Sequence, residues 1–122
     1  MIKSFLWVAG GGAIGSVLRF AVSKWLYSPA FPWGTFVVNI VGCFFIGILW
    51  AVSLKSSSMS DHIKLFLMTG ICGGFTTFST FSIENVTLLR EGKISLFLAY
   101  SLGSLVLGFL ATFLAIKLLD FN

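Results

Sequence analysis

The chain has 122 residues, of which 57% are hydrophobic and 10% are charged, and its mean hydropathy is +1.02. A soluble domain of this size is much less apolar, so we expect an integral membrane protein without a separate soluble domain. The net charge of +4 is distributed over the whole chain, which argues against a nucleic-acid-binding surface.

Four apolar stretches are long enough to cross a bilayer, which requires roughly 20 helical residues. They cover about residues 5–26, 33–54, 63–89 and 95–119, with polar or proline-containing breaks between them. A signal peptide is the alternative for the first stretch, because Lys3 precedes it, but the stretch continues past the short apolar region of a signal peptide. We therefore predict an all-α membrane protein whose single domain has four transmembrane helices.

The basic residues predict no single orientation in the membrane. If the four spans are threaded in order, four lysines and arginines lie on each side. The positive-inside rule needs an excess on one side, so we infer dual topology, in which both orientations occur and an antiparallel homodimer can form. One side carries Lys3, Lys55, Lys64 and Lys117, and the other carries Arg19, Lys24, Arg90 and Lys93.

Polar side chains cluster inside these apolar spans, where each is costly unless it has a partner or faces water. Thr35 and Asn39 lie one helical turn apart in the second span, as do Tyr100 and Ser104 in the fourth. Hydrogen bonds within a helix or to a neighbouring helix are the simpler explanation for any single one of these groups. The third span is the richest, with Thr69, Thr76, Thr77, Ser79, Thr80, Ser82, Glu84 and Asn85.

The third span contains the stretch GICGGFTTFSTFS, residues 70–82. Its paired glycines, Gly73–Gly74, predict a break in the helix near the middle of the membrane. A broken helix exposes carbonyl groups that can bind a cation and amide groups that favour an anion. The alternative is that the glycines only permit close packing, since Gly70–Gly74 and Gly11–Gly15 both have the GxxxG spacing.

On a continuous helix, this stretch would place hydroxyl groups and aromatic rings on opposite faces. Thr76, Ser79 and Thr80 would group on one side, and Phe75, Phe78 and Phe81 on the other. Only one acid, Glu84, lies well inside a span, so no acidic ring favours cations. Hydroxyl and amide donors, together with the positive ring edges of Phe, suit a small anion, although a row of Phe is more often lipid-facing or part of a core.

The remaining reactive side chains predict neither a metal site nor a catalytic set. Cys43 and Cys72 both fall within spans without metal-like spacing, and His62 is the only histidine. We expect the two cysteines to be packing residues and the chain not to be an enzyme.

Three motifs together characterise the chain. They are Gly11-Gly12-Ala13-Ile14-Gly15 with Arg19, then Gly34-Thr35-Phe36-Val37-Val38-Asn39-Ile40-Val41-Gly42, and then GGFTTFSTFS (residues 73–82) with Glu84. In these motifs the chain closely resembles the bacterial fluoride channel family, Fluc/CrcB, over essentially its whole length. The resemblance implies an antiparallel dual-topology homodimer in the bacterial inner membrane, with two pores that conduct fluoride passively and so confer fluoride resistance.

The resemblance also implies roles for individual residues. Asn39 would project into the pore, and Phe78 and Phe81 would meet fluoride with their ring edges. A structural sodium ion at the dimer interface would be bound by the backbone carbonyls of Gly73 and Thr76 from both subunits. The polar route would include Thr35, Ser79, Thr80, Tyr100 and Ser104. Arg19 would be the family's first-span arginine near a membrane surface, and Glu84 would be its third-span acid. One departure is Gly108, where some relatives extend the polar route with a hydroxyl.

Two other functions remain possible from the residues alone. A small proton-coupled multidrug exporter has a similar length and number of spans, but it needs a carboxylate deep in the membrane, and the first span has no acid. A scaffold subunit of a larger membrane complex would use its glycines only for packing and would conduct no ions.

Overall fold

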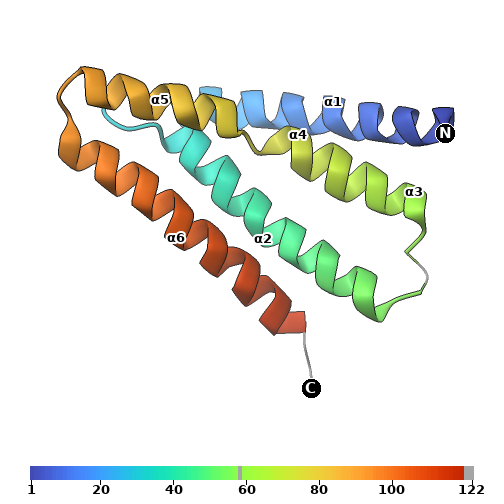
Figure 1. Cartoon of the computed structure of the whole chain (residues 1–122). Helices are drawn as coiled ribbons and strands as arrows, with labels where there is room; N and C mark the ends of the chain where they lie inside the picture. The colour runs from blue at the N-terminus through green and yellow to red at the C-terminus, as the bar shows by residue number, and fades with distance from the viewer. Residues whose placement is uncertain (58, 120–122) are drawn as a thin grey trace.

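The computed structural model describes residues 1–57 and 59–119, which form helices and connections without any strand. Four helical spans are long and apolar enough to cross a membrane, as the sequence predicts (Figure 1). The first, second and fourth are continuous helices: α1 (Ile2–Trp25), α2 (Trp33–Lys55) and α6 (Ile94–Leu119). The third is built from α3 (Asp61–Lys64), the π-helix η1 (Leu65–Cys72), α4 (Gly73–Phe75) and α5 (Phe78–Arg90).

Local chemistry sets where the third span begins and ends. The hydroxyl of Ser60 accepts a hydrogen bond from the amide three residues later (3.2 Å), which caps the start of α3. At the other end Gly92 has a φ of +74°, a left-handed conformation that glycine adopts at little cost. The amides of Gly92 and Lys93 bond to the carbonyls of Leu89 (3.1 Å) and Leu88 (2.9 Å), so this turn satisfies carbonyls at the end of α5 and leads into α6.

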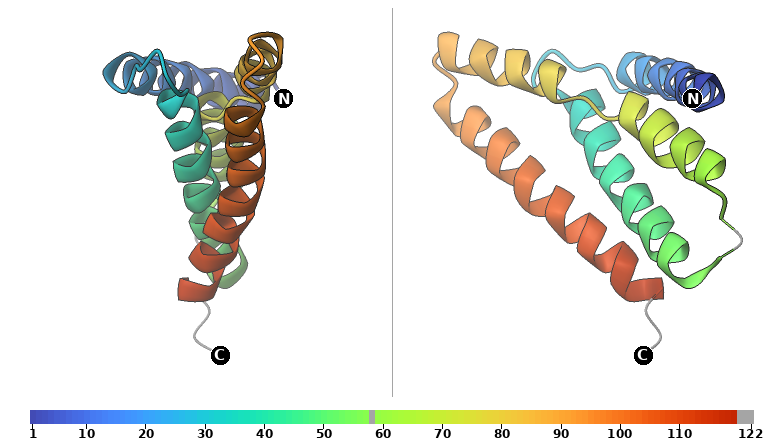
Figure 2. Two further views of the ribbon diagram at one scale, coloured as in Figure 1. Left: turned by 90° about the vertical axis from the view of Figure 1, so that its left-hand side faces the viewer. Right: turned by 45° about the vertical axis from the view of Figure 1, so that its right-hand side comes forward.

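The helices pack mainly as two pairs. α2 lies along α6, and α1 packs on η1 and α4 while crossing the end of the α2–α6 pair (Figure 2). Hydrogen bonds join α6 to α2: the hydroxyl of Thr112 donates to the carbonyl of Cys43 (2.8 Å), and the ammonium of Lys55 donates to the carbonyl of Leu119. The third span therefore has α1 on one side and the α2–α6 pair on another.

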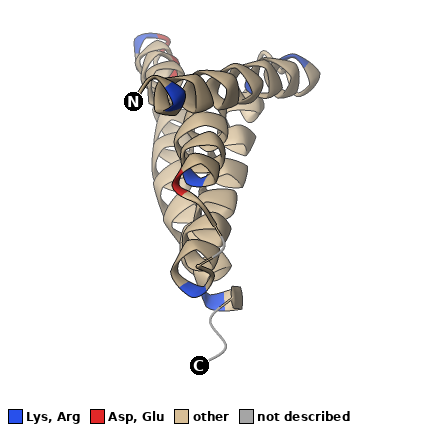
Figure 3. Ribbon diagram, turned by 90° about the vertical axis from the view of Figure 1, so that its right-hand side faces the viewer, with Lys and Arg blue, Asp and Glu red and all other residues tan. Residues whose placement is uncertain are grey.

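The connections lie at the ends of the spans in the order that threading predicts. The start of α1, the α2–α3 connection and the end of α6 lie toward one end of the molecule, and the α5–α6 turn lies at the other (Figure 2). The Lys and Arg residues lie mostly near these ends, with long uncharged segments between them (Figure 3). Arg19 differs, because its side chain is bonded to a carbonyl of α4 within the third span.

The contact between α1 and the third span depends on glycine. A Cβ atom at Gly11 would lie 2.3 Å from the carbonyl oxygen of Phe66, and one at Gly15 would lie 2.2 Å from that of Ile71. From the other side, a Cβ atom at Gly74 would lie 2.6 Å from a carbonyl oxygen of α1. Backbone therefore meets backbone here, so close packing, the alternative reading of these glycines, is one of their roles.

The break in the third span is confirmed, but its predicted position at Gly73–Gly74 is wrong. Both glycines are helical and form α4 with Phe75. The chain leaves the helix at Thr76 (φ −84°, ψ 157°) and Thr77 (φ −149°, ψ 122°). β-Branched residues favour this extended conformation, whereas Gly74 remains helical and uses its missing side chain to admit α1.

The position of the break also corrects the predicted faces of the third span. Phe75 ends α4, whereas Phe78 and Phe81 belong to α5 on the other side of the break. Thr76 lies outside both helices, so it does not share a helical face with Ser79 and Thr80. The periodicity of a continuous helix therefore does not apply across residues 75–78.

We expect Gly15→Ala to lower the free energy of unfolding by about 1–3 kcal/mol, because its methyl group would overlap the backbone of η1. Gly12→Ala in the same helix is the matched control, since no heavy atom lies within 4 Å of a Cβ atom there. That control should be neutral or stabilising by up to about 1 kcal/mol, the helix-propensity difference between Gly and Ala. Denaturant titration in detergent micelles measures both values, and equal effects would contradict the close contact.

Candidate functional site

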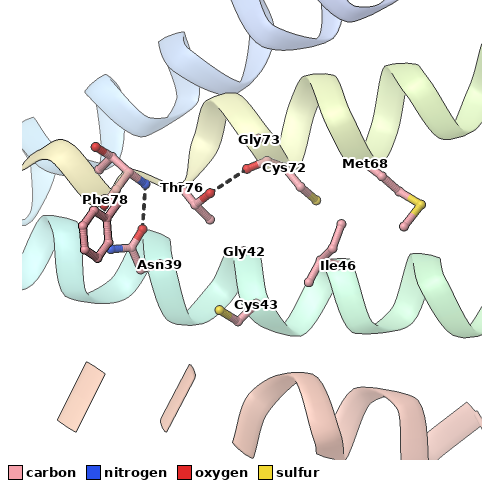
Figure 4. A pocket seen from close by; sticks show the side chains of 10 residues that line it. Asn39, Gly42, Cys43, Ile46, Met68, Cys72, Gly73, Thr76 and Phe78 are labelled. Carbon is pink, nitrogen blue, oxygen red and sulfur yellow. Dashed lines mark hydrogen bonds between the residues drawn. The ribbon is translucent and has the colours of Figure 1, made fainter. Parts of the chain in front are cut away.

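Asn39 on α2 pairs with both backbone groups of Thr77 at the break. Its Nδ2 donates to the carbonyl oxygen of Thr77 (3.1 Å), and its Oδ1 accepts from the amide of Thr77 (2.8 Å) (Figure 4). Backbone groups released by a helix break inside a membrane have no bulk water to bond, so they need partners from the protein. One amide side chain supplies both partners here and fixes the break against the second span.

The start of α5 presents unpaired amides beside this pair. The hydroxyl of Thr77 accepts from the amide of Thr80 (3.2 Å) and lies 3.3 Å from the hydroxyl of Ser79, which is the arrangement of an N-cap. Within residues 1–57 and 59–119, the amides of Phe78 and Ser79 find no acceptor. The positive end of the α5 dipole and two free donors therefore meet at mid-span, where they favour an anion.

The end of α4 has the opposite polarity. The carbonyl of Cys72 accepts both the amide (3.1 Å) and the hydroxyl (3.0 Å) of Thr76, and the carbonyl of Gly74 accepts Nε of Arg19 (3.0 Å). In the part of the chain that is described, the carbonyls of Gly73 and Thr76 accept no hydrogen bond. These oxygens are ligands of the kind that a hard cation such as sodium prefers, so the two predicted sodium-binding residues fit that ion chemically.

A groove of about 350 Å³ runs along the break between α2 and the third span (Figure 4). Four of the predicted site residues line it: Asn39, Gly73, Thr76 and Phe78. Their neighbours in the groove are apolar or sulfur-containing, among them Cys43, Met68 and Cys72. The groove therefore combines a few polar groups at the break with otherwise apolar walls.

A second cavity, of about 440 Å³, lies near the α1–α2 connection and contains three other predicted residues, Thr35, Thr80 and Glu84. Beside it the hydroxyl of Tyr100 donates to a carboxylate oxygen of Glu84 (2.8 Å). Tyr100 is fully buried. This pair gives the only acid well inside a span a defined partner on α6.

Aromatic rings connect the two regions. The ring centroids of Phe78 and Phe81 are 5.8 Å apart, and those of Phe81 and Tyr100 are 5.0 Å apart. Phe78 is 77% exposed, whereas Phe81 is partly buried between Phe78 and the α6 tyrosine. The rings thus form a continuous row from the groove to the Tyr100–Glu84 pair, although Phe75 is not part of it.

Ser79 and Ser104 line neither the groove nor the second cavity. Ser79 is exposed on α5, with its hydroxyl near Thr77. The hydroxyl of Ser104 on α6 is buried and has no partner among the described residues. A buried unpaired hydroxyl is uncommon and costly, so Ser104 is available to a ligand or a water molecule.

Thr77 is the site residue that sequence reasoning did not assign. Its backbone is held by Asn39, and its side chain caps α5. A threonine immediately before a helix is a recognised start signal, and that signal could have placed the break after Phe75. The two glycines that precede it favour an earlier break, because paired glycines are themselves expected to interrupt helices.

Arg19→Met should lower the free energy of unfolding by about 1.5–3 kcal/mol, since it leaves the partly buried end of α4 without its charged donor. Arg90→Met, at the exposed end of α5, is the matched control and should change stability by no more than about 0.5 kcal/mol. Thermal or denaturant unfolding of both variants provides the comparison. Similar losses in the two would show that the Arg19–Gly74 bond contributes nothing specific.

Comparisons with known proteins agree with these features. The family described as "CrcB-like protein, Camphor Resistance (CrcB)" matches residues 6–116. Curated relatives named "Fluoride-specific ion channel FluC" include the protein of Aquifex aeolicus (strain VF5), which is 51% identical over 88% of this chain and 89% of its own. The protein of Agrobacterium fabrum (strain C58) is 48% identical over 91% of each chain, and that of Azobacteroides pseudotrichonymphae is 45% identical over 99% of each.

These matches cover nearly the whole chain, and the relatives are named as ion channels, not as enzymes. With its four membrane-spanning helices and broken third span, the chain is a multi-pass membrane protein that belongs to the CrcB family of fluoride channels.

Proposed function

We propose that this protein is a fluoride-selective channel that lets cytoplasmic fluoride leave the cell passively through the bacterial inner membrane. The names of the relatives support the choice of ion. The observation that carries the proposal is the break at Thr76–Thr77, which places two half-helix ends of opposite polarity at mid-span. Such ends provide backbone groups that can bind ions.

The anion-binding end is the start of α5. Fluoride is small and strongly hydrated, so a narrow dry passage must replace its water with several donors at once. The free amides of Phe78 and Ser79, the second N–H of the Asn39 amide and the hydroxyl of Ser104 are such donors. The edges of Phe78 and Phe81 add the positive part of the ring quadrupole. Thr35 and Thr80 then line a polar route at one end, beside the Tyr100–Glu84 pair.

The cation-binding end is the end of α4. The free carbonyls of Gly73 and Thr76 would hold a structural sodium ion, which supplies a fixed positive charge near the anion route. Gly73 is exposed in a single chain. A second copy that brings the same two carbonyls would complete the coordination shell.

The second copy is placed antiparallel in this proposal. The nearly equal numbers of Lys and Arg at the two ends of the spans support dual topology. The side chain of Arg19 bonds to the third span and does not count as a surface charge. Three Lys and Arg residues then lie at its end of the spans and four at the other, which is still no strong bias. A two-fold arrangement of such chains gives two equivalent fluoride routes, one associated with each α5.

Phe81→Ile should reduce fluoride efflux at least about tenfold, which corresponds to a barrier about 1.4 kcal/mol higher, because it removes a ring edge but keeps apolar volume. Phe109→Ile is the matched control, since Phe109 is 74% exposed on α6, away from the row of rings. Efflux from liposomes is followed with a fluoride electrode. If both variants conduct like the unmodified protein, the rings serve only in packing.

Asn39→Asp tests the position of Asn39 in the route. A carboxylate can still accept the amide of Thr77, but it repels an anion at about 4 Å by roughly 4 kcal/mol at an intermediate effective dielectric. Asp also gives up the bond from Nδ2 to the carbonyl of Thr77, so gel filtration first selects the folded species. In that species we expect fluoride efflux to fall at least about a hundredfold. Unchanged efflux from that folded species would remove Asn39 from the route.

A further inference from the structure

A separate cavity lies where the start of α1 meets the start of the third span. It has a volume of about 480 Å³ and is lined by Lys3, Leu6, Trp7 and His62. The rings of Trp7 and His62 are stacked, with centroids 5.8 Å apart and planes inclined by 20°. Trp7 also meets Phe66 edge-on at 5.7 Å. These contacts place the imidazole and the indole side by side on one wall of the cavity.

The cavity has a basic rim and an apolar floor. Lys3 lies in the first turn of α1, and His62 in the first turn of the third span. Both are therefore at the depth where a membrane changes from headgroups to hydrocarbon. Leu6 is 65% exposed and Trp7 is 41% exposed, one turn further into the span.

The charges around the rim favour an anion. Among the described residues no acidic side chain lies within ion-pair distance of Lys3, and α1 contains no acid. Asp61 is the one acid in the adjoining α3, and Lys64 in the same helix offsets it. The ammonium of Lys3 and a ring N–H of His62 are thus available donors for a phosphate group.

We propose that this cavity binds the headgroup of an anionic phospholipid. The phosphate lies between Lys3 and His62, and the first part of an acyl chain follows Leu6 and the face of Trp7. A soluble anion would use only the rim, whereas a lipid uses both the rim and the apolar floor that continues into the membrane. The proposal concerns a different region from the break and does not rest on fluoride conduction.

Native mass spectrometry of the purified protein in detergent, with added phosphatidylglycerol or phosphatidylcholine, tests the proposal. Lys3→Gln should weaken retention of phosphatidylglycerol about fivefold, which corresponds to the roughly 1 kcal/mol that a basic residue contributes near an anionic surface. His62→Gln should weaken it in the same direction, while phosphatidylcholine binding stays unchanged. Lys24→Gln, at the opposite end of α1, is the control. Its retention of phosphatidylglycerol should stay within twofold of that of the unmodified protein.

Two results would overturn the proposal. One is equal retention of phosphatidylglycerol by the Lys3→Gln, His62→Gln and Lys24→Gln proteins. The other is full displacement of the lipid by millimolar inorganic phosphate, which would assign the rim to a soluble anion. Circular dichroism checks that each variant is folded. We expect all three to fold, because the side chains of Lys3, Lys24 and His62 are exposed.

Discussion

The pair of hydrogen bonds between the Asn39 side chain and the backbone of Thr77 is the interaction on which the rest of the structure depends. A membrane-spanning helix can break only if the backbone groups that it releases find partners, because an unsatisfied group in hydrocarbon costs several kcal/mol. Asn39 satisfies an N–H and a C=O at once, and it does so from another span. The break therefore has a fixed place and direction. The groups that remain available to ions are the free amides at the start of α5 and the free carbonyls at the end of α4.

The glycines of α1 and the third span serve the same break from the other side. Because Gly11 and Gly15 carry no side chain, α1 approaches η1 and α4 until backbone touches backbone. That approach brings Arg19 to the carbonyl of Gly74, where its charge complements the negative end of the α4 half-helix. The third span is thus held by α2 at Thr77 and by α1 at Gly74, which leaves the carbonyl of Gly73 free between these two attachments.

Much of this arrangement follows from the sequence because its signals are local and strong. Apolar length alone located the four spans, and the paired glycines correctly indicated that the third helix is broken. The position of the break depends on more than these glycines. Paired glycines weaken a helix in isolation, but here α1 occupies the space beside Gly74, and the extended residues are Thr76 and Thr77. The π-helical turns of Leu65–Cys72 and the bond from Arg19 also depend on packing between spans, and neither has a distinct local pattern.

We expect the opposite half-helix ends at mid-span to make a passage for a small, strongly hydrated anion. The most direct measurement is anion efflux from liposomes that contain the purified protein, with fluoride and chloride compared under the same gradient. We expect rapid release of fluoride and negligible release of chloride. Absence of fluoride release from vesicles that contain folded protein, or equal release of the two anions, would contradict this expectation.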